Sequence, residues 1–152
     1  MTERIHIRYG ELRDVHILRD FNIAMAKETE SKKLDPEIAD KGVKNLINHP
    51  ERGFYLMAEC GTKIAGSLMI TREWSDWRNG FFWWIQSVYV LPEFRRIGIF
   101  KSLYQKVQTL AKKEKDVCGL RLYVDRDNKP AIQTYLALGM QETDYLLFET
   151  EF

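Results

Sequence analysis

The stretch Val90-Leu-Pro-Glu-Phe-Arg-Arg-Ile-Gly-Ile-Phe-Lys-Ser-Leu-Tyr104 links an apolar run to an amphipathic one through a short basic loop. The run before it, residues 81–90, is the longest β-prone segment of the chain and predicts a central strand. Apolar residues at three- and four-residue spacing from Ile99 onward predict a helix reaching about Lys115. A helix that begins where a strand ends exposes unpaired amides, and Gly98 lets the backbone approach an anion closely. The stretch therefore has the outline of a phosphate-binding elbow.

This elbow is locally basic, although the chain as a whole is not. The sequence has 23 Lys and Arg against 22 Asp and Glu, a formal net charge of +1, which argues against nucleic acid or an anionic membrane surface as partners. From Arg95 to Lys115, however, seven basic residues accompany a single acid, Glu114. An alternative stays open, in which these charges are the solvated face of a helix and Gly98 is only a tight turn.

Composition predicts one domain over residues 1–152, because 45% hydrophobic residues in 152 are ample for a packed core. Cys60 and Cys118 have neither metal-ligand spacing nor the density of a disulfide framework, so we expect two buried thiols, no metal and a cytoplasmic location. No apolar run approaches the ~20 residues of a membrane span, and the amino terminus lacks an apolar signal core. We therefore expect no membrane partner.

Short strands and helices alternate along the chain. Alternation and β-propensity predict strands over residues 4–9, 54–59, 63–72, 81–90, 120–124 and 145–148, and helical periodicity predicts helices over 11–27, 36–49, 99–115 and 128–138. Asp35 is the expected N-cap of the second helix, with Pro36 at its first position, and Gly139 is expected to end the last helix. The order βααβββαβαβ predicts an α/β sandwich.

A second motif follows the elbow after about 30 residues, the separation that one crossover unit requires. It consists of Asn128, Ala131, Tyr135, Gly139 and Met140. Together with Arg95, Gly98 and Phe100 of the elbow, these positions resemble the GNAT family of N-acetyltransferases. The resemblance implies an α/β three-layer fold, with a mixed, mostly antiparallel sheet, a splayed central strand pair and helices on both faces. It also implies an enzyme of the acyltransferase class that uses acetyl-coenzyme A.

The resemblance further implies which residues hold the cofactor. The elbow would bind the pyrophosphate, and the strand over Val88–Val90 would pair with the pantetheine arm. The expected cofactor-binding residues are Val88, Tyr89, Val90, Arg95, Arg96, Ile97, Gly98, Ile99, Phe100, Lys101, Ser102 and Asn128. Asn128 is equally explained as a helix cap, and both roles can hold together. Phe100 departs from the family, which usually has Gly or Ala there, and its ring either points away from the ligand or reshapes the cradle.

Catalytic candidates also follow from the resemblance. Tyr135 is expected to protonate or stabilise the departing thiolate as a general acid, with a buried aromatic whose hydroxyl is merely satisfied as the alternative. Many relatives carry a Glu at the position of Gln86, and an amide cannot accept the proton of an ammonium substrate. We keep Glu73 and Glu28 as candidates for the base or for binding the amine, although each is more often a solvated carboxylate.

The acceptor is predicted only as a class. Residues 11–40 contain eight acidic and five basic side chains, which favours a cationic primary amine of a small molecule or peptide. Trp74, Trp77, Phe81, Phe82, Trp83 and Trp84 offer aromatic faces for a cation. The alternative is a packed sheet face or a subunit contact, and a homodimer would cover an open sheet edge. Gln86 and Phe100 also keep open a non-catalytic module that binds acyl-coenzyme A.

Overall fold

The computed structural model describes residues 4–152, which form two compact units. The first reaches Leu122 and the second spans Tyr123–Phe152. Within residues 4–152, no helix combines the length and the apolar character needed to cross a membrane. The expectation of a single domain over 1–152 stays a prediction.

The first unit is built on a five-stranded sheet in the order β1-β2-β3-β4-β5. The strands are β1 (Ile5–Tyr9), β2 (Gly53–Cys60), β3 (Lys63–Ser75), β4 (Gly80–Val90) and β5 (Val117–Arg121). Neighbours are antiparallel except β4 and β5, which are parallel because a helical crossover joins them. This mixed, mostly antiparallel sheet confirms the predicted fold class.

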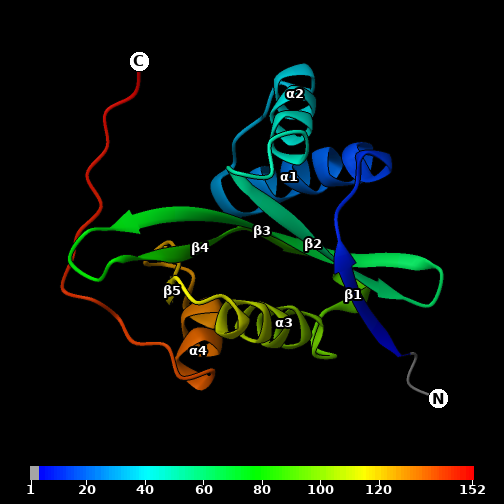
Figure 1. The fold of residues 1–152 in the computed structure, drawn as a ribbon. Helices are drawn as coiled ribbons and strands as arrows, with labels where there is room; N and C mark the ends of the chain where they lie inside the picture. Colours follow the sequence, from blue (N-terminus) through cyan, green and yellow to red (C-terminus); the bar gives the residue numbers. More distant parts are fainter. Residues whose placement is uncertain (1–3) are drawn as a thin grey trace. The chain divides into compact units, whose positions relative to one another are not determined.

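Helices cover both faces of this sheet (Figure 1). On one face lie α1 (Val15–Glu30) and α2 (Pro36–Ile47), and on the other lies α3 (Ile99–Lys113). Short 3-10 turns, η1 (Leu12–Asp14) and η2 (Pro92–Phe94), precede α1 and α3. The predicted cap of α2 is confirmed, because the Asp35 carboxylate accepts hydrogen bonds from the amides at 37 and 38.

Alternation along the strands divides the core into two layers. Tyr55 and Met57 of β2 pack against α1 and α2 in a buried cluster completed by Val15, Leu18, Val43 and Leu46. The intervening Leu56 points to the opposite face, toward α3, where Leu103 and Val107 have no exposed surface. Each such side chain removed from water contributes roughly 1.5–3 kcal/mol to folding.

A cluster of charged side chains links β1 to β2 and to the η1 turn before α1. The Arg8 guanidinium donates to both oxygens of the buried Asp14, at 2.7 and 2.9 Å, and pairs with Glu59 of β2. Burial acts to raise the pKa of Asp14, but hydrogen bonds from Arg8 and the Glu11 amide outweigh it, so this pKa lies below its ordinary value. The ionised Asp14 therefore stabilises the turn that aims α1 across the sheet.

The hairpin of β3 and β4 is longer than predicted. Residues 73–80 were expected to form a polar loop, but pairing continues to Ser75 opposite Gly80, and only residues 76–79 turn. Asn79 adopts a positive φ of 50°, a conformation that Asn tolerates better than most residues. The polar side chains of this arm were misleading, because an antiparallel arm with exposed surface needs no continuous apolar face.

Two further boundaries differ from the prediction. The last strand of the sheet spans residues 117–121 instead of 120–124, because its parallel register places Val117 opposite Phe81. Cys118 lies on this strand and is exposed, so only Cys60 is buried as expected. The strand predicted over 145–148 was wrong, since those residues have no regular structure and their side chains are exposed. High β-propensity makes a strand only where a neighbouring strand accepts its hydrogen bonds.

The second unit contains one helix, α4 (Lys129–Ala137), among its described residues. Asn128 caps its start, with the side-chain oxygen accepting from the Ala131 amide at 3.3 Å. Gly139 follows the helix with φ +91°, a left-handed conformation that glycine adopts without strain. The predicted cap and stop of this helix are both confirmed.

Candidate active site

The elbow leads from the end of β4 to the first turn of α3. After η2, Arg95 is extended, Arg96 has φ +67° and Gly98 has φ +87° as the N-cap of α3. Residues 95–98 are all exposed, whereas Ile99 is buried and fixes the start of the helix. The left-handed Gly98 turns the chain so that the helix begins directly behind an exposed loop.

This arrangement leaves exposed, unpaired backbone amides at the start of α3. The Ser102 amide bonds to the Gly98 carbonyl at 3.0 Å, so the amides of residues 99–101 precede the first helical hydrogen bond. A Cβ built on Gly98 meets no atom within 4 Å, so the space beside this backbone is open. Arg96 and Lys101 are exposed beside it and add positive charge.

Arg95 does not lie free over this surface, because its guanidinium is held by three partners. Its Nε donates to the Val90 carbonyl at 2.9 Å, its Nη2 donates to Glu28 Oε2 at 2.8 Å, and its carbon lies 5.6 Å from the centre of the Tyr89 ring. The Tyr89 hydroxyl donates to the other Glu28 oxygen at 3.2 Å. Burial, and then the charge of Glu28, raise the pKa of Tyr89. The last turn of α1 is thus tied to the elbow through Glu28.

The edge of β4 that faces β5 is open over its second half. The two strands pair only from Phe81 to Trp84, so among residues 4–152 no strand pairs with this edge from Ile85 to Val90. This divergence is the splayed strand pair expected from the resemblance. It leaves backbone amides and carbonyls available to an extended ligand, next to the elbow.

A β-bulge shapes the same part of β4. Ser67 pairs with Tyr89 and Met69 pairs with Gln86, so β4 carries one residue more than β3 between these pairs. Ser87 in the bulge has φ +51°, an uncommon conformation for a residue with a Cβ. Sequence reasoning missed this feature, because serine in a strand carries no signal for a left-handed backbone.

Gly66 permits a close approach of β3, β4 and α3. A Cβ there would lie 2.6 Å from the Tyr89 carbonyl oxygen and 3.3 Å from a methyl of Ile99. Only glycine therefore lets the end of β4 and the start of α3 meet over β3. This contact fixes where the elbow lies on the sheet.

Gln86 and Glu73 lie on the same face of the sheet but at different places. The Gln86 amide donates to Thr71 Oγ1 at 3.1 Å, close to the bulge. Glu73 accepts from the Trp84 indole at 2.6 Å and from Arg121 at 3.1 Å, so both of its oxygens are engaged. Glu73 pairs with Phe82, four residues before Gln86, which corresponds to about 13 Å along the strand. The structure therefore separates Glu73 from the bulge, whereas Glu28 contacts the side chain of Tyr89, two residues after Ser87.

Phe100 lies on α3, and the aromatic residues between positions 74 and 84 lie on β3, on β4 and in the turn between them. The Phe100 ring lies 6.1 Å from that of Tyr104, one turn further along α3. Alternation sends Trp83 toward α3, whereas Phe82 and Trp84 face the opposite side. Trp74 packs its ring 4.9 Å from that of Phe81. The aromatic residues on the two strands are therefore divided between two faces, Trp77 lies in the turn, and the six do not form one cage.

The second unit holds the other two predicted site residues. Asn128 is the N-cap of α4 and Tyr135 lies within the helix, seven residues or about 10 Å further along its axis. Tyr135 is partly buried, and burial raises the pKa of its hydroxyl above that of an exposed phenol. The phenol is thus protonated at neutral pH and retains a proton to donate.

The chain belongs to the acetyltransferase (GNAT) family, because the sequence profile of that family matches residues 15–140. A possible acetyltransferase from Clostridium difficile 630 has 43% identity to this chain and a TM-score of 0.91, with 99% of each chain covered. A predicted acetyltransferase with acetyl-CoA from Clostridium acetobutylicum has the same fold, with 17% identity, a TM-score of 0.78 and 97% and 96% of the two chains covered.

A curated relative is the thialysine N-epsilon-acetyltransferase of Caenorhabditis elegans, 32% identical over 97 residues. The match spans 64% of this chain and 58% of that relative, so it leaves more than a third of each outside. Acetyltransferases of the GNAT family use acetyl-CoA, and solved neighbours carry acetyl-CoA or CoA. The elbow and the open edge of β4 fit such a ligand, because they offer amides to both its phosphates and its extended arm.

Proposed function

We propose that this protein transfers the acetyl group of acetyl-CoA directly to a primary amine of a small molecule or peptide. The observation that supports the proposal is that the elbow directly follows the open edge of β4. A pyrophosphate at the amides of residues 99–101 would place an extended arm along Val88–Val90, and the arm would end near the Ser87 bulge. When bound, acetyl-CoA supplies an activated thioester.

Each predicted cofactor residue has a role in this proposal. The backbone from Ile97 to Ser102 receives the phosphates, and the exposed Arg96 and Lys101 provide positive charge. Arg95 acts instead as a strut, because its Nε and Nη2 hold the guanidinium between Val90 and Glu28. Asn128 caps α4 and can offer its amide nitrogen to the arm, while its oxygen serves the helix.

Proton transfer follows from the same contacts. The Gln86 amide cannot remove a proton from an ammonium, and Glu73, on β3 opposite Phe82, lies too far along the sheet to reach an amine at the bulge. We propose that Glu28 orients the elbow and that the attacking amine loses its proton to water. Activity should then rise with pH as the amine deprotonates. Burial raises the pKa of Tyr135, so its phenol is protonated at neutral pH and is available to the departing thiolate.

The acceptor is proposed to be a cationic amine carried on a flexible chain. The acidic balance of residues 11–40 favours a cation, and a relative named for an ε-amine supports a lysine-like side chain. Glu73 is about 13 Å from the bulge along the sheet and already engages Trp84 and Arg121, so we do not assign it to the reacting amine.

A second candidate is a non-catalytic module that binds acyl-CoA. The observation in its favour is Gln86, hydrogen bonded to Thr71 where a catalytic carboxylate would be expected. Such a module would bind acetyl-CoA with the same elbow and would turn over no amine.

We also propose a homodimer, in which exposed apolar side chains of the second unit cover a sheet edge of a second copy. Tyr145, Leu146, Leu147 and Phe148 are each more than two thirds exposed. Unpaired β-prone segments of this kind are prone to pair with another chain. Light scattering that gives only the 18.0 kDa monomer would exclude the dimer. A cytoplasmic location stays a prediction.

The function is tested by calorimetric titration of acetyl-CoA, followed by a turnover screen with lysine, thialysine and a lysine-bearing peptide. Tyr135→Phe should lower kcat about 10²- to 10³-fold with little change in the affinity for acetyl-CoA. Binding without turnover of any amine would favour the regulatory module. Absence of binding would contradict both functions.

A further inference from the structure

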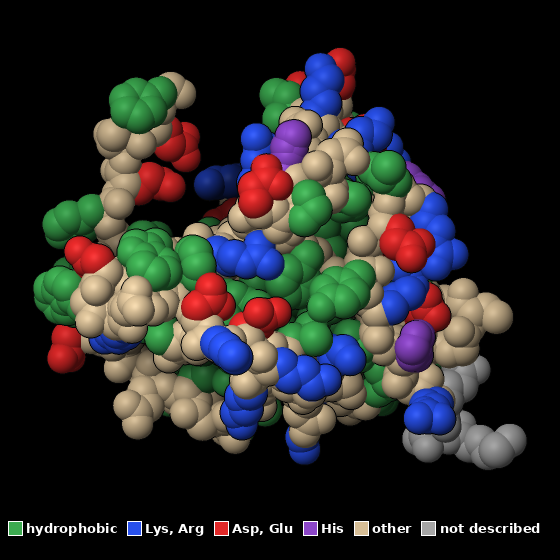
Figure 2. All heavy atoms as spheres, viewed as in Figure 1, with side chains coloured by type: hydrophobic (Ala, Val, Ile, Leu, Met, Phe, Trp, Pro, Cys, Tyr) green, Lys and Arg blue, Asp and Glu red, His purple; other side chains and the backbone are tan. Residues whose placement is uncertain are grey.

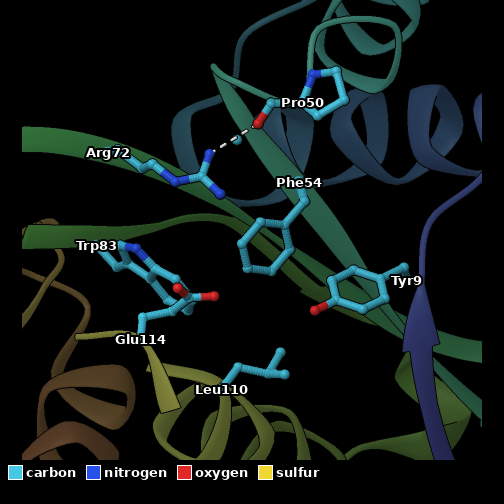
Figure 3. A pocket seen from close by; sticks show the side chains of 8 residues that line it. Tyr9, Pro50, Phe54, Arg72, Trp83, Leu110 and Glu114 are labelled. Carbon is cyan, nitrogen blue, oxygen red and sulfur yellow. Dashed lines mark hydrogen bonds between the residues drawn. The ribbon is translucent and has the colours of Figure 1, made fainter. Parts of the chain in front are cut away.

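A second hollow lies on the α3 face of the sheet, away from the elbow (Figure 3). It has a volume of about 270 Å³ and draws its lining from β1 to β4 and the end of α3. Trp83 lies five residues before Val88 on β4, a separation of about 17 Å along the strand. Leu110 lies eleven residues after the start of α3, which is again about 16 Å. The cavity is therefore distinct from the proposed cofactor site.

The walls of this cavity are aromatic. The Phe54 ring makes edge contacts with Tyr9 at 5.4 Å and with Trp83 at 5.3 Å between ring centres. Trp83 is only 4% exposed, whereas Tyr9 is 51% exposed and forms the open rim. Leu110 of α3 closes the floor (Figure 3). The interior thus suits an apolar group with the width of a side chain.

Two opposite charges flank these walls. Arg72 donates one hydrogen bond from Nη1 to the Pro50 carbonyl at 2.9 Å, and its guanidinium lies 5.6 Å from the Phe54 ring centre. The Glu114 carboxylate lies across the hollow, in front of Trp83 (Figure 3). Among residues 4–152, neither Arg72 nor Glu114 forms an ion pair. Arg72 therefore keeps donors for a ligand, and Glu114 keeps both oxygens.

The position of Glu114 is also unfavourable for the helix it follows. It is the C-cap of α3, where the helix dipole places partial negative charge and a carboxylate is repelled. Lys112 and Lys113 in the last turn are the residues that stabilise this helix end. A carboxylate at position 114 therefore does not stabilise the helix, whereas it is suited to pair with a cationic group of a ligand.

We propose that this cavity binds a free α-amino acid with an apolar side chain. Its carboxylate would pair with Arg72, its ammonium with Glu114, and its side chain would enter between Phe54, Trp83 and Leu110. The volume lies just below the roughly 300–1,000 Å³ of pockets for drug-sized ligands, which matches a molecule of amino-acid size. A ligand of about 12 heavy atoms with ordinary efficiency binds with a Kd of about 1 mM.

The proposal is tested by titrating L-phenylalanine and L-leucine into the protein without acetyl-CoA, by calorimetry and by NMR of the tryptophan indoles. The Trp83 indole signal should shift, whereas that of the exposed Trp77 should not. N-acetyl-L-phenylalanine lacks the ammonium and L-phenylalaninamide lacks the carboxylate, so each should bind at least tenfold more weakly. Equal binding of either analogue would overturn the assignment of a zwitterion.

Two variants locate the site. Glu114→Gln should weaken amino-acid binding about tenfold and leave acetyl-CoA affinity unchanged, and Arg72→Gln should do the same if it stays folded. Glu149→Gln, an exposed carboxylate of the second unit, serves as the matched control. No binding at 20 mM amino acid, or binding that survives Glu114→Gln, would overturn the proposal. Because acetyl-CoA affinity is measured separately, failure here is distinguishable from failure of the proposed function.

Discussion

Replacing Gly98 tests whether the elbow holds the pyrophosphate. Gly98 has φ +87°, and a Cβ there meets no atom within 4 Å, so a side chain would fit without a clash but with backbone strain. Asn and Asp tolerate this conformation best, at a cost of about 1 kcal/mol. Gly98→Asn and Gly98→Asp are therefore a matched pair with nearly the same shape and strain, and they differ in one negative charge.

The size of the charge effect follows from the exposure of the loop. Two unit charges 4 Å apart repel by about 1 kcal/mol in water and about 4 kcal/mol near a protein surface. For this exposed loop we take about 1–2 kcal/mol, which predicts that the Asp variant binds acetyl-CoA roughly 5- to 30-fold more weakly than the Asn variant. At high salt the difference should shrink, since the screening length falls from about 10 Å at 0.1 M to about 3 Å at 1 M.

The assay is calorimetric titration of acetyl-CoA into both variants at low and high salt, with thermal unfolding as the control for folding. Equal affinities of the Asn and Asp variants at low salt would refute the placement of the pyrophosphate at Gly98. A difference that persists unchanged at 1 M salt would indicate a local structural effect instead of charge repulsion.

Three further predictions follow from named contacts. Glu28→Gln and Arg95→Gln should each weaken acetyl-CoA binding about threefold to fivefold, and the double variant should be no worse than either, because the two residues form one half-exposed ion pair. Additive losses of affinity in calorimetry would contradict the role of Arg95 as a strut. A loss of kcat in Glu28→Gln without a loss of binding would instead support Glu28 as the base. Gly66→Ala should lower the free energy of unfolding by about 1–3 kcal/mol in urea titrations, because its methyl would collide with the backbone of β4, and an unchanged midpoint would contradict this packing. Asp14→Asn should cost about 2 kcal/mol at pH 7, because the partly buried Arg8 loses a charged partner. The pKa of Asp14 in the folded protein lies below its unfolded value of about 3.9, so its contribution to the free energy of unfolding is present above pH 4 and is lost as the pH falls through the folded pKa. The free energy of unfolding of Asp14→Asn should therefore change less between pH 5 and pH 3 than that of the wild type.

Most helices and strands were predictable because they depend on local patterns. The cap at Asp35, the stop at Gly139 and the helix after Gly98 each follow from the conformational preference of one residue, so the sequence is enough to place them. Boundaries set by a partner strand were missed. β5 begins at Val117 because of its register with β4, and the arm around Glu73 is a strand because β4 lies beside it.

In the candidate site, too, features that depend on neighbouring residues could be predicted and features that depend on distant pairing could not. The elbow and the residue types that suit a phosphate could be predicted, because a strand, a glycine and a helix start are adjacent in the chain. The bulge at Ser87 could not, since a strained backbone is held by pairing on both sides of it. Sequence alone also left Glu28 and Glu73 equivalent as carboxylates.

The sequence by itself determined the order of the elements as far as α4, the caps, the elbow at Gly98 and the family to which these motifs belong. Only the tertiary structure decided that Glu28 meets Arg95, 67 residues away, and that Glu73 meets Arg121, 48 residues away. It likewise brought Arg72 and Glu114 to opposite sides of one aromatic cavity. Local preferences are encoded in neighbouring residues, whereas the environment of a charged side chain depends on which distant elements pack against it.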